Sequence, residues 1–343
     1  MNDRNILRSS LPFAALAAAT MMTGAAESRD ILLNYERLSS LEEPLSMEFG
    51  AVTLVLNGVL DSAVIRDFDD SGASGSGFSG NVRIAAFAQL PNRWRVGVTG
   101  FGQVAAGKVL DDDTGENTSG NLALSVGGVW GTVLAGNVSG TVREQTRRAR
   151  GVGNAALAFD GFLGGLGDAG AGYTGRFGPW TIAAAVDGDG NVDFGAMSQR
   201  PHGTSDYRVT LRAYSADYAA SGSRTFDTSG AGIVGELVHG STTVDAGVTY
   251  ERFASSGPGA DRWAASSGVR KKTGALSLSL EGHYGRIEDS DEFAAALGVQ
   301  IDIARGLSVN FGVNHSRAEA TGNALRAIDT EETKTAVSIR YSF

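Results

Sequence analysis

The chain has 343 residues, of which 48 are glycine, 6 are proline and none is cysteine. Glycine at about twice its ordinary frequency argues against a helix bundle, because glycine inside a helix costs about 1 kcal/mol relative to alanine. The lack of cysteine excludes a disulfide scaffold and a thiolate metal site, and a net charge of −9 argues against non-specific nucleic-acid binding.

Residues 1–26 have the pattern of an export signal. Arg4 and Arg8 precede an apolar stretch at residues 11–22, and small residues at 23–26 suit cleavage. No other segment approaches the ~18 consecutive apolar residues of a transmembrane helix. Leucines among charges at 27–47 predict either a short amphipathic segment, on the periplasmic side or in the lumen of a barrel, or a poorly ordered leader.

Apolar and polar side chains alternate with period two from residue 48 to the end of the chain. In the final segment Val337 and Ile339 share one face, while Ser338 and Arg340 share the other. This alternation predicts strands with one face toward an apolar medium and one toward water. The predicted strands are 48–61, 79–90, 93–107, 119–128, 129–138, 171–177, 179–187, 191–199, 207–218, 226–239, 242–253, 261–272, 275–287, 292–304, 307–318 and 332–343.

The connections between these strands alternate in length. Every second one is tight, as at Pro91-Asn92 and Thr273-Gly274, and the others are mostly longer, with the longest at 139–170. Short turns at one end and long loops at the other, with an even strand count, are typical of outer-membrane barrels. The predicted fold is all-β, a transmembrane antiparallel β-barrel of about 16 strands over residues 48–343, with its long third loop folded into the lumen.

The end of the chain carries a family resemblance. Phe343 follows Tyr341, Ile339 and Val337 at alternate positions, and this end resembles the terminal strand that bacterial outer-membrane proteins present to the barrel assembly machinery. The strand count and the long third loop resemble the Gram-negative general porins, especially the alphaproteobacterial type. The resemblance implies a homotrimer in the outer membrane that contacts lipid and lipopolysaccharide, with Tyr341 and Phe343 as assembly signal. It further implies a passive channel for small hydrophilic solutes and ions, with no cofactor and no enzymatic activity.

The third loop is the candidate pore constriction. Its apolar side chains, such as Leu157 and Phe162, predict packing against the inner wall, because they would be unfavourable in extracellular water. The resembled porins commonly place acids on this loop, whereas this loop is net positive, which predicts a mild anion preference. The charged candidates are Arg143, Glu144, Arg147, Arg148, Arg150, Asp160 and Asp168 on the loop, and Arg83 and Arg95 on the wall.

Other interpretations remain open. A solute-specific porin for sugar or phosphate and a non-conducting structural or adhesin barrel both fit the pattern. The acidic clusters at 67–70 and 111–116 predict cation-bridged contact with lipopolysaccharide, or solvated loops. An enzyme is not indicated, since no serine lies in a catalytic motif and the four histidines lie on different hairpins. Residues 187–193 begin like a calcium loop but lack its glycine and glutamate, so at most a weak cation site is expected there.

Overall fold

The computed structural model describes residues 44–68, 74–107, 117–167, 169–220, 224–254, 259–321, 325–326 and 328–343. The expected export signal, most of the 27–47 segment, the acidic cluster at 111–116 and Asp168 lie outside these residues. Within the described ranges, no helix is both long and apolar enough to cross a bilayer.

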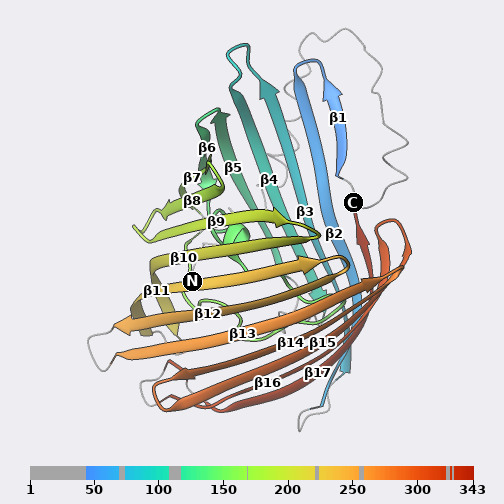
Figure 1. Ribbon diagram of the computed structural model, residues 1–343, viewed down its shortest axis with the longest axis vertical. Coiled ribbons are helices and arrows are strands. Elements are labelled where there is room, and N and C mark those ends of the chain that lie inside the picture. Colours follow the sequence, from blue (N-terminus) through green and yellow to red (C-terminus); the bar gives the residue numbers. More distant parts are fainter. Residues whose placement is uncertain are drawn as a thin grey trace, which may run out of the picture.

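Sixteen antiparallel strands, β2 to β17, close into a barrel in the described part of the chain (Figure 1). Each strand pairs with its neighbours in sequence, and β17 pairs with β2 to close the ring. The predicted sixteen-stranded barrel is therefore confirmed. The strands are β2 (Val52–Asp67), β3 (Ser74–Gln89), β4 (Arg95–Gly107), β5 (Asn117–Gly128), β6 (Gly131–Asn137), β7 (Ala169–Phe177), β8 (Trp180–Asp187), β9 (Val192–His202), β10 (Ser205–Ala220), β11 (Arg224–His239), β12 (Thr242–Ala254), β13 (Ala260–Thr273), β14 (Leu276–Ile287), β15 (Ser290–Ala304), β16 (Leu307–Ala318) and β17 (Thr330–Ser342).

The start of the first predicted strand is wrong. The chain forms an additional strand, β1 (Leu45–Phe49), turns at Gly50 and only then enters β2. Gly50 has a φ of 62°, a left-handed conformation that costs glycine little, so the turn interrupts an otherwise continuous alternating pattern. β1 pairs with Val52 to Leu56 of β2, on the edge where β17 pairs with Val59 to Asp67. β1 therefore pairs with the part of this β2 edge that β17 does not reach.

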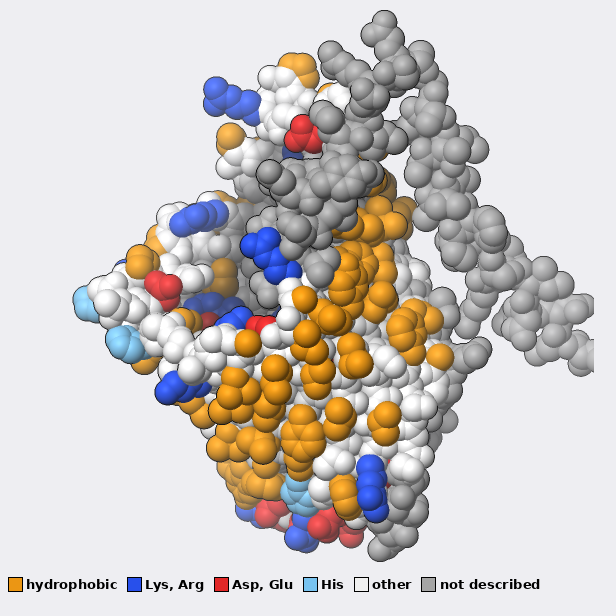
Figure 2. Space-filling view, turned by 90° about the vertical axis from the view of Figure 1, so that its right-hand side faces the viewer, with side chains coloured by type: hydrophobic (Ala, Val, Ile, Leu, Met, Phe, Trp, Pro, Cys, Tyr) orange, Lys and Arg blue, Asp and Glu red, His pale blue; other side chains and the backbone are white. Residues whose placement is uncertain are grey.

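The two faces of the wall differ as the alternation predicts. On β14, Leu278 and Leu280 point outward and are 43% and 56% exposed, whereas Ser277 and Ser279 point inward and are 6% and 3% exposed. Figure 2 shows hydrophobic side chains spread over one side of the barrel, with charged side chains gathered toward its ends. Such an outer surface suits hydrocarbon, and the polar inner surface suits water.

The third loop, between β6 and β7, folds into the barrel as predicted and contains the short helix α3 (Arg143–Thr146). Val138 and Val142, each 1% exposed, pack with Ala183 and Ala185 of β8 on the inner wall. Phe162 lies with its ring centroid 4.8 Å from that of Tyr214 on β10. The apolar side chains of the loop thus find inside the barrel the contacts that extracellular water would not give.

Candidate pore constriction

Arg148 anchors the third loop to the inner wall. Its NH1 donates to Asp245 Oδ1 on β12 at 2.6 Å, and its NH2 donates to Glu281 Oε1 on β14 at 3.0 Å and to Asp160 Oδ2 at 3.1 Å. The side chain is only 3% exposed. Arg148 is therefore a buried anchor bound to the wall acids, whereas Asp160, which binds Arg148, is exposed.

A second arginine clamps the same stretch of loop from the wall side. Arg270 on β13 donates to the backbone carbonyls of Ala149 and Arg150 and shares the carboxylates of Asp245 and Glu281 with Arg148. The backbone N–H of Gly151 donates to Glu281 Oε2 at 3.0 Å. Two guanidinium groups facing two wall carboxylates satisfy the charges that burial would otherwise make costly.

Glycines on the inner wall leave room for the loop. A Cβ added at Gly298 on β15 would lie 1.9 Å from the carbonyl oxygen of Val152, and one at Gly312 on β16 would lie 2.2 Å from that of Asn154. Around them, polar wall groups bind the loop backbone: the Val152 N–H donates to Ser279 Oγ at 2.9 Å. The close approach of loop to wall therefore depends on the absence of side chains at these two positions.

The distal half of the loop is held by a separate buried network. Arg262 on β13, whose side chain is fully buried, donates to the carbonyls of Phe159 and Gly161, each at 2.8 Å. Its charge is balanced by Glu251 at 2.5 Å and Glu292 at 2.6 Å. Together with the Arg148 cluster, this network fixes the loop along the inner faces of β12 to β15.

The loop between β16 and β17 also contacts this network. Arg326 NH2 lies 2.8 Å from Glu292 Oε2, and its guanidinium lies 5.2 Å from the centroid of the Phe159 ring. His283 contacts the same Glu292 through Nε2 at 3.2 Å. The last long loop is thereby joined to the third loop inside the barrel mouth.

Four other charged side chains of the third loop are not buried against the wall. Arg143, Glu144, Arg147 and Arg150 are exposed, and none of the three arginines forms an ion pair within the described residues. The pKa of Arg147 is lowered, first by desolvation inside the barrel and next by the positive charge of Arg150. This side of the loop is therefore electropositive.

Arg83 and Arg95 on the wall are also exposed and unpaired with any described carboxylate. Each guanidinium lies over an inward-facing ring: Arg83 is 5.5 Å from the Phe101 centroid, and Arg95 is 5.2 Å from that of Phe87. Stacking of this kind orients the cation without neutralising it. By strand alternation, Arg83 lies on the same face of β3 as the buried Ala85, and Arg95 lies on the same face of β4 as the buried Thr99.

Several wall acids, in contrast, are neutralised. The closest contacts are between Asp193 and Arg212 at 2.7 Å, Glu236 and Arg208 at 3.1 Å, and Asp61 and Arg340 at 2.6 Å. These acids are each held by an arginine, whereas Arg83, Arg95, Arg143, Arg147 and Arg150 have no described carboxylate partner. The number of acids in the sequence does not reveal this difference in pairing.

The weak cation site considered at 187–193 has another role. Both oxygens of Asp187 accept hydrogen bonds, from the backbone of Asp189 and Asn191, the Asn191 amide and the backbone of Gly167. Asp193 is bound by Arg212. This stretch forms the turn between β8 and β9 and secures the end of the third loop. Across the described ranges, no group of three or more histidine, aspartate or glutamate side chains is placed to hold a metal ion.

Phe343 lies at the seam of the barrel. Its backbone exchanges two hydrogen bonds with Gly58 of β2, at 2.8 and 3.0 Å, and its ring lies 5.6 Å from that of Tyr341. A Cβ at Gly58 would lie 2.9 Å from the Phe343 ring. The C-terminal aromatic residue is thus part of the pairing that closes the ring of strands.

Solved structures share this architecture. The anion-selective porin from Comamonas acidovorans aligns with a TM-score of 0.62 at 16% identity, covering 85% of this chain and 100% of that one. The trimer form of OmpT, an outer membrane protein of Vibrio cholerae, aligns with a TM-score of 0.64 at 16% identity, with the same coverage. A mutant of the Rh. blastica porin aligns with a TM-score of 0.51 at 16% identity, over 84% of this chain and 100% of that one. At these identities the likeness shows a porin-type barrel fold.

No protein-family model matches the sequence. No curated protein matches it either.

Proposed function

We propose that the chain is a porin of the Gram-negative outer membrane, a passive channel for small hydrophilic solutes and ions. The observation that carries this proposal is the closed barrel whose anchored third loop leaves Arg143, Arg147 and Arg150 exposed inside it. A wet, charged lumen lowers the free energy of moving a polar solute across hydrocarbon. The likeness to solved porins supports the proposal, which requires no cofactor and no enzymatic step.

The proposed channel prefers anions. Five arginines exposed in the lumen have no described carboxylate partner: Arg83, Arg95, Arg143, Arg147 and Arg150. Charges beside the ion path outweigh acids on the outer loops that lie beyond about 8 Å, the Debye length at physiological salt. The name of the Comamonas acidovorans structure, an anion-selective porin, is in line with this preference.

The proposed assembly is a homotrimer in contact with outer-membrane lipid and lipopolysaccharide. Strands β6 and β8 have 7 and 8 residues, and β7 between them has 9, whereas a tilted strand needs about 9–11 residues to cross hydrocarbon. A neighbouring subunit on this side would shield the part of the wall that is too short to match the hydrocarbon layer. The trimer form of OmpT supports such an arrangement. Tyr341 and Phe343 at the seam are the proposed signal for the barrel assembly machinery, and the resemblance to the alphaproteobacterial type remains part of the proposal.

Planar-bilayer recordings test the channel. Purified protein is expected to produce stepwise conductance that grows with salt concentration, and to let small neutral sugars enter liposomes at rates that fall with sugar size. Empty detergent micelles from a mock purification serve as control. Protein that inserts and resists proteolysis but gives no conductance would instead be a non-conducting structural or adhesin barrel.

A further inference from the structure

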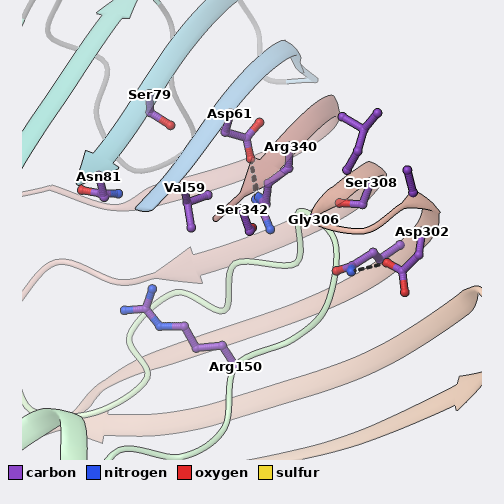
Figure 3. A pocket seen from close by; sticks show the side chains of 13 residues that line it. Val59, Asp61, Ser79, Asn81, Arg150, Asp302, Gly306, Ser308, Arg340 and Ser342 are labelled. Atoms are coloured by element: carbon purple, nitrogen blue, oxygen red, sulfur yellow. Dashed lines mark hydrogen bonds and ion pairs between the residues drawn. The ribbon is translucent and has the colours of Figure 1, made fainter. Parts of the chain in front are cut away.

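A recess of about 500 Å³ opens beneath the third loop, toward the end of the barrel that carries the short turns. Its wall comes from β2, β3, β15, β16 and β17. Gly306, in the short turn between β15 and β16, also lines it, so the recess reaches the short-turn end of the barrel. The volume lies in the range that small-molecule sites occupy. Arg150 reaches into this recess from the third loop (Figure 3).

The orientation of Arg150 is imposed by the clamp described above. Arg270 holds the carbonyls of Ala149 and Arg150 against β13, and Glu281 holds the N–H of Gly151. Because the backbone faces the wall, the Arg150 side chain extends away from it, toward the strands that carry Val59 and Asn81 (Figure 3). The side chain is thus positioned by a rigid support while its guanidinium stays free.

The recess combines this free cation with unused polar groups. The side chains of Ser79, Asn81 and Ser342 line it and make no hydrogen bond within the described residues. Hydroxyl and amide groups of this kind donate to oxyanions alongside a guanidinium, whose planar donor fork matches carboxylate and phosphate geometry. Four side chains with free donors therefore surround one cavity.

The two acids that line the recess, Asp61 and Asp302, do not neutralise the positive charge of Arg150. Asp61 is bound by Arg340 at 2.6 Å, and Asp302 is bound by Lys272 at 3.0 Å. Asp302 also accepts from the Gln300 amide at 2.7 Å. With these pairs balanced, the cavity retains the single positive charge of Arg150.

We propose that this recess binds a small solute bearing an oxyanion, a phosphate or a carboxylate, with Arg150 as its charged anchor and Asn81, Ser79 and Ser342 as neutral donors. The inference rests on the proposed porin function and adds to it a saturable binding site between the constriction and the short-turn end. An anion that has passed Arg143 and Arg147 would pause there before leaving at the short-turn end.

The experiment uses inorganic phosphate as probe and succinate as the carboxylate alternative. Chloride current through single channels is recorded while each probe is added on the short-turn side, and phosphate binding to the detergent-solubilised protein is measured separately by calorimetry. The wild type is expected to show saturable block by at least one probe. Arg150→Gln is expected to weaken that block, and the corresponding calorimetric affinity, by about tenfold or more.

Two control variants separate the site from general charge effects. Arg143→Gln removes the same charge from the same loop outside the recess, so it should weaken the anion preference of the current but leave the calorimetric affinity for phosphate unchanged. Asn81→Ala should weaken the block severalfold without altering ion selectivity, since it removes no charge. Each variant must retain the heat-modifiable gel mobility of a folded barrel.

The outcomes distinguish the two levels of proposal. Block that never saturates with either probe, or an equal loss of calorimetric phosphate affinity in Arg150→Gln and Arg143→Gln, would overturn the proposed binding site and leave an ordinary anion-preferring pore. If calorimetry shows binding that depends on Arg150 but the protein gives no conductance, the binding site is supported and the channel function is refuted. Preference for phosphate over succinate, or the reverse, assigns the oxyanion.

Discussion

Arg147 and Arg148 are neighbours in the sequence and lie in opposite environments. Arg147 is exposed in the lumen, whereas Arg148 is 3% exposed and bound to Asp160, Asp245 and Glu281. The difference follows from backbone direction: after α3 the chain becomes extended, and consecutive side chains then point to opposite sides. One arginine can contribute to selectivity and the next can only contribute to anchoring.

Removing the buried member should destabilise the barrel. Arg148→Ala leaves Asp245 and Glu281 with Arg270 alone and takes from Asp160 its described partner, and breaking such a buried network costs about 3–5 kcal/mol. Arg147→Ala, a change at an exposed position, should alter the free energy of unfolding by about 0.5 kcal/mol or less. Urea unfolding in detergent, followed by tryptophan fluorescence, measures both. Equal destabilisation by the two substitutions would contradict the assigned roles.

The inner-wall glycines offer a second test at this scale. Gly298→Ala would place a methyl group 1.9 Å from the Val152 carbonyl oxygen, so the loop must move away from β15. We expect a loss of about 1–3 kcal/mol, typical of overpacking, together with an altered single-channel conductance. Gly282→Ala on β14 is the matched control, because a Cβ there meets nothing within 4 Å. A conductance unchanged by Gly298→Ala would show that the loop does not depend on this contact.

At the scale of elements, the strands were predictable because their signals are local. β14 was expected at 275–287 and spans Leu276–Ile287, since its leucines alternate with polar residues and a Gly274 turn precedes it. The β1–β2 turn was missed because the alternating pattern continues on both sides of Gly50. Only its positive φ breaks the strand there.

The anchoring of the third loop could not be predicted in the same way. Asp245 and Glu281 lie 97 and 133 residues after Arg148, and only the strand registers bring them together. The apolar residues of the loop did indicate that it packs inward, because burial is a property of composition. Which arginine would be buried depends on acids of distant strands and on the gaps left by Gly298 and Gly312.

The alternation of connections gives a topological prediction. Asn92 lies in the short turn after β3, and Asp289 lies in a connection at the opposite end of the barrel, with its side chain fully exposed. Since the chain has no cysteine, single cysteines at these positions report on sidedness without interference. In intact cells, Asp289→Cys should react with an impermeant maleimide and Asn92→Cys should not. The reverse labelling would invert the orientation.

At the scale of the whole molecule, the unequal strand lengths predict where subunits meet. Val133 on β6 and Leu280 on β14 both face outward, 43% and 56% exposed, but only Val133 lies on the side with short strands. Val133→Arg should dissociate the trimer in mild detergent, and Leu280→Arg should leave it assembled. Native mass spectrometry measures the subunit number. A monomeric wild type, or dissociation only by Leu280→Arg, would count against this interface.

The central claim is that local arginines make the pore prefer anions in a chain of net charge −9. The most direct measurement is the reversal potential under a potassium chloride gradient, for the wild type and for the triple variant Arg143→Gln, Arg147→Gln and Arg150→Gln. We predict a wild-type potential of the sign set by chloride, and a clear shift toward the potassium side in the variant. A cation-selective wild type, or an identical potential in the variant, would contradict the claim.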